Sequence, residues 1–289
     1  MSSAASIRAR LMNISREESI PFQVLIFRFL HERLLYRMSR TKWADSFVLK
    51  GGNLMYAQQG ILTRPTKDID YLAVNLRNDI SLMTMVFAEV CTESYSDDSV
   101  WFDEKSISAE TISEQEKYEG VRIHIQAGFD TISQQIQIDI GFGDIMTPQP
   151  EKIVYPVLLK ELESPFIKAY SNETVIAEKF QTMIELAEIN SRMKDFYDVY
   201  FILQSGNYNI VILQEAIHST FRNRETVFSG NHSFFSDSFV SSPDRNKMWE
   251  AFMKKINDSS SLSFSDVMGL LTRELQPIWM RMNENSNES

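Results

Sequence analysis

The sequence predicts an α+β protein in which a strand-rich N-terminal half precedes a helical C-terminal half. Residues 47–71 read as a strand, a glycine turn, a short helix and a second strand. Residues 121–142 alternate apolar and polar side chains, which is typical of a half-buried hairpin. Beyond these segments apolar residues recur at helical spacing to the end of the chain. We therefore expect two domains, residues 1–168 and residues 169–289.

Composition bounds the class of protein. The chain has 289 residues, of which 43% are hydrophobic, so a substantial core is expected. One cysteine, Cys91, excludes a disulfide framework, and the four histidines show no zinc-ligand spacing. No apolar run reaches membrane length, and the first residues lack the apolar core of a signal peptide. We expect a cytoplasmic protein with no membrane partner.

The charge is acidic overall but uneven. The formal net charge is −10, which disfavours binding of nucleic acid over the whole surface. Residues 1–50 nevertheless contain nine lysines and arginines against four acids. This excess indicates either a local basic face or an ordinary solvated helix surface.

The remaining elements follow from periodicity and capping signals. A capping box at Ser15 and the apolar spacing after it predict a long helix to about Ser39. Residues 78–93 predict a second helix, and residues 94–115 are expected to form a polar loop with a short strand near Trp101. A short strand is expected at 166–170. The helices expected in the second half cover residues 172–188, 191–204, 209–221, 244–256 and 264–282.

Two acids mark the centre of the first half. Side chains alternate between the faces of a strand, so Asp68 and Asp70 point to the same face. A divalent metal is the usual partner of such a carboxylate pair. Asp139 lies on the polar face of the hairpin and is a candidate third carboxylate. A solvent-facing acid is the alternative for Asp139, and the strand taken alone favours it.

Charged residues also fall inside the helical half. Lys179 lies within the apolar arc of its helix, where it either extends its amine to water or binds a phosphate. On the next helix Arg192 is expected within the apolar arc, Asp195 at its edge and Asp198 further out. Arg192 and Asp195 are three residues apart and are expected to pair.

The glycine pair, the D-x-D strand and the later acid resemble the signature of the nucleotidyltransferase superfamily. More specifically, the chain resembles the AbiEii/AbiGii family of nucleotidyltransferase-like toxins over residues 47–203. The segments that carry the resemblance are Lys50-Gly51-Gly52, Thr66-Lys67-Asp68-Ile69-Asp70, Tyr155-Pro156, Ala177-Glu178-Lys179-Phe180 and Ser191-Arg192-Met193-Lys194-Asp195-Phe196-Tyr197-Asp198.

The resemblance implies a minimal nucleotidyltransferase fold, a mixed sheet flanked by helices, followed by a helical domain, with the nucleotide between them. It implies catalytic roles for Asp68, Asp70, Lys179 and Asp195. The residues assigned to nucleotide binding are Lys50, Gly51, Gly52, Thr66, Lys67 and Arg192. The metal ligands are Asp68, Asp70 and, from the superfamily signature, Asp139.

The expected activity is transfer of a nucleotide from an NTP to an RNA acceptor with Mg²⁺ or Mn²⁺. Family members imply tRNA as the acceptor, a toxin–antitoxin or abortive-infection role, and a cognate antitoxin as a candidate partner. Two alternatives stay open. One is nucleotidylylation of a protein hydroxyl, and the other is a catalytically silent nucleotide-binding module, which the intact acids and lysine disfavour.

Overall fold

The computed structural model describes residues 3–61, 63–95, 97–114, 118–227, 230–258 and 260–287. The chain divides into two compact units, which we call the sheet unit and the helical unit. The sheet unit comprises Met1–Asp144 and Pro150–Tyr170, and the helical unit comprises Ile145–Gln149 and Ser171–Ser289.

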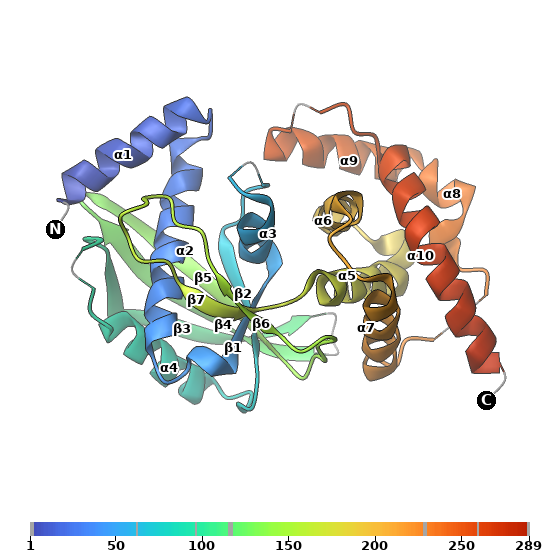
Figure 1. Ribbon diagram of the computed structural model, residues 1–289, viewed down its shortest axis with the longest axis horizontal. Helices are drawn as coiled ribbons and strands as arrows, with labels where there is room; N and C mark the ends of the chain where they lie inside the picture. The colour runs from blue at the N-terminus through green and yellow to red at the C-terminus, as the bar shows by residue number, and fades with distance from the viewer. Residues whose placement is uncertain are drawn as a thin grey trace. The chain divides into compact units, whose positions relative to one another are not determined.

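The sheet unit contains one seven-stranded mixed sheet with the strand order β3-β4-β5-β2-β1-β7-β6 (Figure 1). β2 lies at its centre, antiparallel to β1 and parallel to β5, and β1 in turn pairs in parallel with β7. The strands are β1 (Phe47–Lys50), β2 (Asp68–Ala73), β3 (Trp101–Glu114), β4 (Tyr118–Phe129), β5 (Ile132–Phe142), β6 (Glu151–Val154) and β7 (Phe166–Ala169). The predicted mixed sheet flanked by helices is confirmed.

Apolar side chains cover one face of the sheet and fix the orientation of the central strands. Tyr71 of β2 is buried and its ring contacts Phe47, which in turn contacts Phe87 of α4 (Ile80–Thr92). Phe129 of β4 packs edge to face on Phe29 of α2 (Phe22–Arg40) in the same way. Side chains alternate along a strand, so with Tyr71 on the apolar face the carboxylates of Asp68 and Asp70 point to the opposite face of the sheet.

The N-terminal helices differ from the prediction. Two helices, α1 (Ala4–Glu17) and α2, replace the single helix expected to begin at Ser15. Ser15 lies in the last turn of α1, where its hydroxyl donates to the carbonyl of Ile20 instead of capping a helix. Pro21 occupies the cap position of α2, where the missing N–H of proline costs nothing.

The region predicted as a polar loop with a short strand near Trp101 is a 14-residue edge strand, β3, which begins at Trp101 and pairs with β4. Its register shifts between Asp103 and Ser108, and it lies at the edge of the sheet. An edge strand with a register shift does not need a regular alternation of apolar and polar residues, which is the pattern that identifies a strand in a sequence. The strand β6 was not predicted either. The hairpin of β4 and β5, the helix α4 and the strand β7 form where the sequence predicted them.

A local basic face, one of the two explanations for the N-terminal excess of basic residues, loses three of its nine cations, because three arginines are buried in α2. Arg28, Arg33 and Arg37 are at most 5% exposed. Arg37 holds both oxygens of Asp98 at 2.8 and 3.1 Å, and Arg33 donates to the carbonyl of Glu163 at 2.8 Å. These cations tie α2 to loops of the sheet unit, so they are not available to a nucleic acid.

The helical unit packs around an aromatic core. Phe180, Phe221 and Trp279 contact one another, and Phe196 stacks near Phe234. The described helices are α5 (Asn172–Leu186), α6 (Met193–Ser205), α7 (Ile210–Asn223), α8 (Asp237–Val240), α9 (Pro243–Ile256) and α10 (Phe264–Asn287). Short 3₁₀ turns cover Ala187–Ile189 and Ser233–Phe235, and the sheet unit adds Ala44–Ser46 and the helix α3 (Gly51–Gln59).

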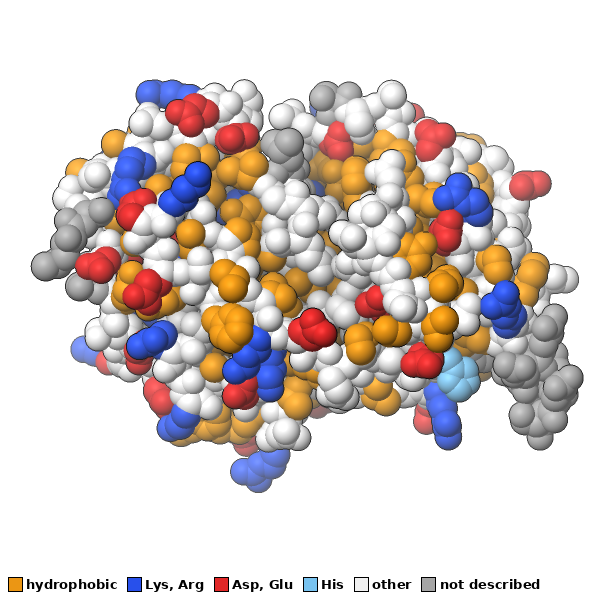
Figure 2. Space-filling model, viewed as in Figure 1, with side chains coloured by type: hydrophobic (Ala, Val, Ile, Leu, Met, Phe, Trp, Pro, Cys, Tyr) orange, Lys and Arg blue, Asp and Glu red, His pale blue; other side chains and the backbone are white. Residues whose placement is uncertain are grey.

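Five helices of the helical unit form where the sequence predicted them, with ends that differ by a few residues. The Ser- and Asn-rich segment before α9 contains α8, where the sequence predicted only loop, and α10 runs beyond the predicted end to Asn287. The described helices include none whose length and apolar character would let it cross a membrane. On the face drawn in Figure 2, basic and acidic side chains of the described residues are intermixed.

Candidate functional site

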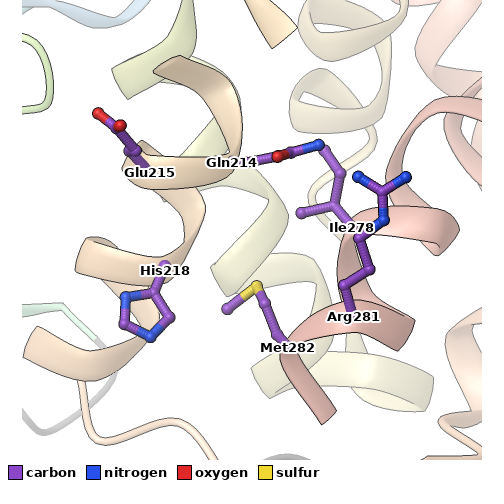
Figure 3. A pocket seen from close by; sticks show the side chains of 6 residues that line it. All are labelled: Gln214, Glu215, His218, Ile278, Arg281 and Met282. Atoms are coloured by element: carbon purple, nitrogen blue, oxygen red, sulfur yellow. The ribbon is translucent and has the colours of Figure 1, made fainter. Parts of the chain in front are cut away.

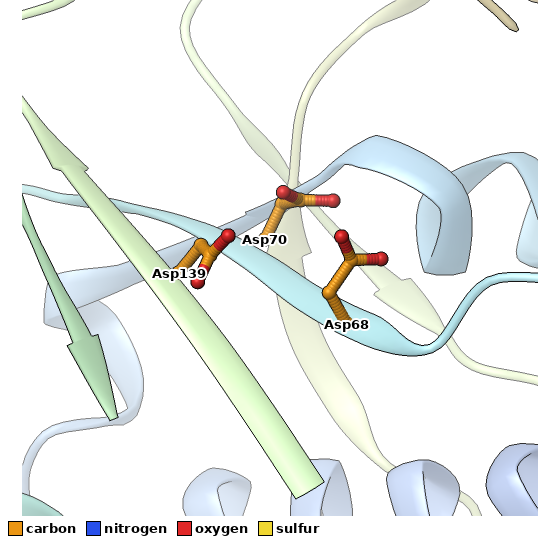
Figure 4. A group of neighbouring side chains, drawn as sticks. All are labelled: Asp68, Asp70 and Asp139. Carbon is orange, nitrogen blue, oxygen red and sulfur yellow. The ribbon is translucent and has the colours of Figure 1, made fainter. Parts of the chain in front are cut away.

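Three aspartates converge on the polar face of the sheet. Asp68 and Asp70 lie on β2, and Asp139 lies on β5 directly opposite Asp70. One carboxylate oxygen from each of the three lies within 4.8 Å of the others (Figure 4). All three residues are half-buried. The structure thus brings together the acids that the sequence assigned to a metal.

The glycine turn lies against these acids. Gly51 begins α3 with φ of +67°, a left-handed conformation that glycine adopts without strain. A Cβ at this position would lie 1.8 Å from Oδ2 of Asp70. A Cβ on Gly52 would lie 2.6 Å from the side chain of Thr66. The side chain of Asp70 therefore occupies the space that a Cβ at Gly51 would need, and Thr66 occupies the corresponding space at Gly52.

Asp68 is held from two sides. Thr66 donates its hydroxyl to Oδ1 of Asp68, and Asn53 of α3 donates its amide to the backbone carbonyl of Asp68 at 2.7 Å. Asn53 is 1% exposed, and its own carbonyl lies 3.3 Å from Nδ1 of His31 and 3.2 Å from the hydroxyl of Tyr155. Burial lowers the pKa of His31 to about 4, so the ring is neutral near pH 7.

Asp139 has a strong partner on the next strand. Arg122 of β4 donates Nε and Nη2 to the two oxygens of Asp139, each at 2.8 Å. The amide of Gln137 adds contacts of 3.1 Å to the same two oxygens. The hydrogen bonds to Asp139 raise the pKa of Arg122. Asp139 is therefore both a member of the acid cluster and the partner of a cation.

The donor set fits a divalent cation. Converging carboxylates repel one another unless positive charge lies between them. Carboxylate oxygens are the ligands that Mg²⁺ and Mn²⁺ prefer. Asp68 and Asp70 would hold such an ion, and Asp139 would join them if its contact with Arg122 were exchanged.

Two lysines of this unit, Lys50 and Lys67, were assigned to nucleotide binding. Lys50 is paired with Asp70 across β1 and β2, and its amine is 3.2 Å from Oδ2 of Asp144. The same amine lies over the ring of Tyr170, 5.6 Å from its centroid. Lys67 is exposed beside Asp68.

The second charged cluster belongs to the helical unit. Lys179 of α5 lies 2.5 Å from Oδ1 of Asp195 and 2.9 Å from Oδ2 of Asp198, both on α6. Arg192 donates to the other oxygen of Asp195 at 2.7 Å, which confirms the predicted pair. The order of burial predicted for the charged residues at the start of α6 is wrong. Asp195 and Asp198 are 1% and 2% exposed, whereas the side chain of Arg192 is 37% exposed.

This reversal has a local cause. Arg192 is the residue before α6 begins, so it does not share the helical geometry from which its position was predicted. Lys179 supplies the positive charge that lets both acids be buried. Although burial alone would raise the pKa of Asp195, Lys179 and Arg192 hold it far below its ordinary value. Asp195 is therefore ionised at any physiological pH.

A separate pocket of about 280 Å³ lies between α7 and α10 (Figure 3). None of the site residues predicted from the sequence lines it. The residues that do are Gln214, Glu215, His218, Ile278, Arg281 and Met282.

Three members of these clusters were not singled out in the sequence: Arg122, Asn53 and the inward-facing Asp198. A signal existed for Arg122. Counting outward from the turn between Phe129 and Ile132 pairs residue 122 with Asp139. The role of Asn53 has no comparable signal, because it depends on how α3 packs against β2.

A mixed sheet that presents clustered acids beside a glycine turn defines a nucleotidyltransferase-like protein, and this fold is what the sequence predicted. The sequence also matches the model of the nucleotidyl transferase AbiEii toxin family of type IV toxin–antitoxin systems over residues 33–269. The chain belongs to this family. The nucleotidyltransferase toxin resemblance is thereby confirmed.

Two solved structures are similar to the chain. JHP933 from Helicobacter pylori is 11% identical with a TM-score of 0.50, over 92% of this chain and 95% of that one. A provisionally assigned nucleotidyltransferase from H. pylori is 13% identical with a TM-score of 0.49, over 91% and 97% of the two chains. The first likeness supports the fold. Comparison with curated proteins gave no match.

Proposed function

We propose that this family member is a metal-dependent nucleotidyltransferase toxin that transfers a nucleotide from an NTP to RNA, with tRNA as the acceptor. The observation that carries the proposal is the convergence of Asp68, Asp70 and Asp139, with the glycine turn at Gly51 packed directly against Asp70. We assign the protein to the cytoplasm and to a toxin–antitoxin or abortive-infection role, with a cognate antitoxin.

The sheet unit supplies the metal half of the chemistry. A divalent cation held by the acids would neutralise charge on the α-phosphate and on the departing pyrophosphate. Thr66 and Asn53 hold Asp68 in place for this task. The backbone at Gly51 lies directly against Asp70, and we assign the backbone N–H groups of Gly51 and Gly52 to the phosphate oxygens. Lys50, Thr66 and Lys67 would contact the nucleotide from the same face.

The helical unit supplies the cationic half. Lys179 would bind the triphosphate oxygens or the leaving group. Asp195 fixes the direction of the Lys179 amine, and Arg192 in turn fixes Asp195. Asp198 lies 2.9 Å from the same amine and helps to hold it in place.

A second acceptor class has support of its own. The net charge is −10 and three N-terminal arginines are buried, which leaves less basic surface for RNA than the sequence indicated. A protein hydroxyl is therefore the second candidate acceptor. We place RNA first because the family resemblance implies tRNA, and a silent nucleotide-binding module last because the acids converge.

The deciding experiment incubates the purified protein with Mg²⁺, each of four α-labelled NTPs, total RNA and a protein extract. We expect label in tRNA, and none with Asp68→Asn. An exposed acid of the same sheet, Asp103, provides the control, and Asp103→Asn should label as the unmodified protein does.

Label in protein alone would move the acceptor to the second candidate. Label that persists in Asp68→Asn would remove the acid cluster from the chemistry. No label in either fraction, with intact binding of an NTP, would favour the silent module. Growth arrest on expression, with relief by Lys179→Ala, tests the toxin role separately.

A further inference from the structure

A row of charged side chains crosses the sheet at the acid cluster. The strand registers place in line Glu110 of β3, Arg122 of β4, Asp139 of β5, Asp70 of β2 and Lys50 of β1. Directly opposed residues of adjacent strands point to the same face. The signs along the row run negative, positive, negative, negative, positive, so a cation stands on each side of the two central acids.

Arg122 grips Asp139 in the geometry that best suits a carboxylate. Two parallel N–H donors of one guanidinium meet its two oxygens, both at 2.8 Å. Gln137 donates to the same oxygens. A carboxylate engaged at both oxygens must give up a contact before it can bind a metal ion. The side chain of Arg122 is 31% exposed, so it has room to move.

We propose that Arg122 and the divalent cation compete for Asp139. This inference rests on the proposed metal centre of Asp68 and Asp70. Without the cation Arg122 neutralises Asp139 and holds the cluster together. When the cation binds, Asp139 turns to it and Arg122 turns to Glu110, which stands opposite on β3 and is 60% exposed.

Two consequences follow from this competition. Because the cation takes Asp139 only where the Arg122 contact is broken, the contact lowers the apparent affinity for the cation, and removing Arg122 restores that affinity by the same factor. The released guanidinium keeps its charge beside the acids, where it remains available to Glu110. Arg122 is thus a positioning residue that sets the cation concentration at which the third acid becomes a ligand.

The direct test follows the Arg122 side chain by NMR in the intact protein. The Nε–Hε resonance is assigned by its loss in Arg122→Gln. Mg²⁺ is then added to saturation, which calorimetry monitors in parallel. We expect the resonance to move and its proton to exchange faster with water as Mg²⁺ binds.

Calorimetry of variants supplies a second measurement. Arg122→Gln should bind Mg²⁺ at least ~5-fold more tightly, and Arg122→Lys, which keeps the charge but loses the fork, should fall between it and the unmodified protein. Arg77→Gln removes one exposed positive charge elsewhere on the unit and should leave binding within ~2-fold.

The outcomes separate the two claims. An Arg122 resonance that stays unchanged while Mg²⁺ saturates an Asp68-dependent site overturns the competition and leaves the metal centre intact. Mg²⁺ binding that does not depend on Asp68 and Asp70 contradicts the metal centre of the proposed function and the competition with it. Equal affinities of Arg122→Gln and the unmodified protein also contradict the competition.

Discussion

The two charged clusters of this protein are built on opposite plans. In the sheet unit three half-buried carboxylates meet within 4.8 Å, and Arg122 binds one of them, Asp139. In the helical unit two buried acids, Asp195 and Asp198, share the amine of Lys179. The first cluster concentrates negative charge, which a bound cation would offset, whereas the second is built around a cation of the protein itself.

This difference shows what a charged cluster reveals about its role. Acids that converge in one cluster indicate a candidate cation site, because their mutual repulsion opposes folding. Acids that are matched by cations have a structural explanation as well as a functional one, so their part in catalysis has to be tested apart from stability. The variants below exploit that contrast, beginning with the largest expected effect.

Asp68→Asn and Asp195→Asn make the same substitution in the two clusters. Asp68→Asn should lower nucleotide transfer by at least ~10³-fold, because it removes a proposed metal ligand. Its free energy of unfolding should change by less than about 1 kcal/mol, since one of three repelling charges is gone. Transfer assays and urea unfolding measure the two quantities. Asp195→Asn should be clearly destabilised, and equal loss of stability in both variants would erase the distinction between the clusters.

Lys179→Met tests the neutralised cluster. It should lower the free energy of unfolding by roughly 3–5 kcal/mol, because it leaves Asp195 and Asp198 buried without their cation. Chemical denaturation measures the loss. Lys194→Met removes an exposed lysine of α6 and should cost less than about 0.5 kcal/mol.

A double variant separates structure from chemistry at Lys179. Adding Asp195→Asn to Lys179→Met should restore part of the stability. Nucleotide transfer should stay absent if the Lys179 ammonium acts on the triphosphate. Transfer that returns together with stability would assign Lys179 a structural role alone.

Sequence reasoning succeeded where local pattern and structure coincide. The period-two alternation located β4 and β5, and the alternation of β2 placed Asp68 and Asp70 on one face. It failed for β3, whose edge position and irregular register leave no apolar alternation. It also failed for the burial of Asp198. That carboxylate can be buried because Lys179, on another helix, supplies a positive charge beside it.

Contacts between distant elements account for the other gaps. The sequence contains Asn53 beside the glycine pair, but its bond to the Asp68 backbone exists only because α3 packs on β2. The buried arginines of α2 are similar. Their spacing is that of an amphipathic surface, and loops far along the chain, at Asp98 and Glu163, supply the partners that bury them.

Gly51→Ala tests whether transfer depends on the close packing of the glycine turn against Asp70. The new Cβ would overlap Oδ2 of Asp70, and the left-handed φ would be strained, so transfer should fall by ~10²-fold. Gly206→Ala is the matched control. Gly206 also has a φ of +67°, but nothing lies within 4 Å of its Cβ position. It should lose about 1 kcal/mol of stability and keep full activity. Equal activity losses in both variants would make backbone strain, not overlap with Asp70, the cause.

Titration of single groups should affect the two units in different pH ranges, and this is the smallest expected effect. His31 in the sheet unit has a folded pKa of about 4, below its ordinary value of 6.5. As pH falls through 6.5, the unfolded chain takes up a proton at His31 that the folded chain does not, which lowers stability by about 2 kcal/mol between pH 7 and pH 5. Burial raises the pKa of Glu32, the next residue of α2, to about 7, so protonation of Glu32 stabilises the folded unit over the same range and offsets this loss. The contribution of His31 is therefore the difference between the unmodified protein and His31→Asn. Asp195 in the helical unit has a lowered pKa, so its contribution persists to about pH 4 and is lost only below it.

Fluorotryptophan NMR in urea can distinguish these ranges, because Trp43 and Trp101 report on the sheet unit and Trp249 and Trp279 on the helical unit. From pH 7 to pH 5, the urea midpoint of the first pair should fall relative to that of His31→Asn, whose side chain does not titrate. The second pair should respond to pH in the same way in both proteins. Equal pH responses of the first pair in His31→Asn and the unmodified protein would mean that His31 does not contribute to the pH dependence of the sheet unit.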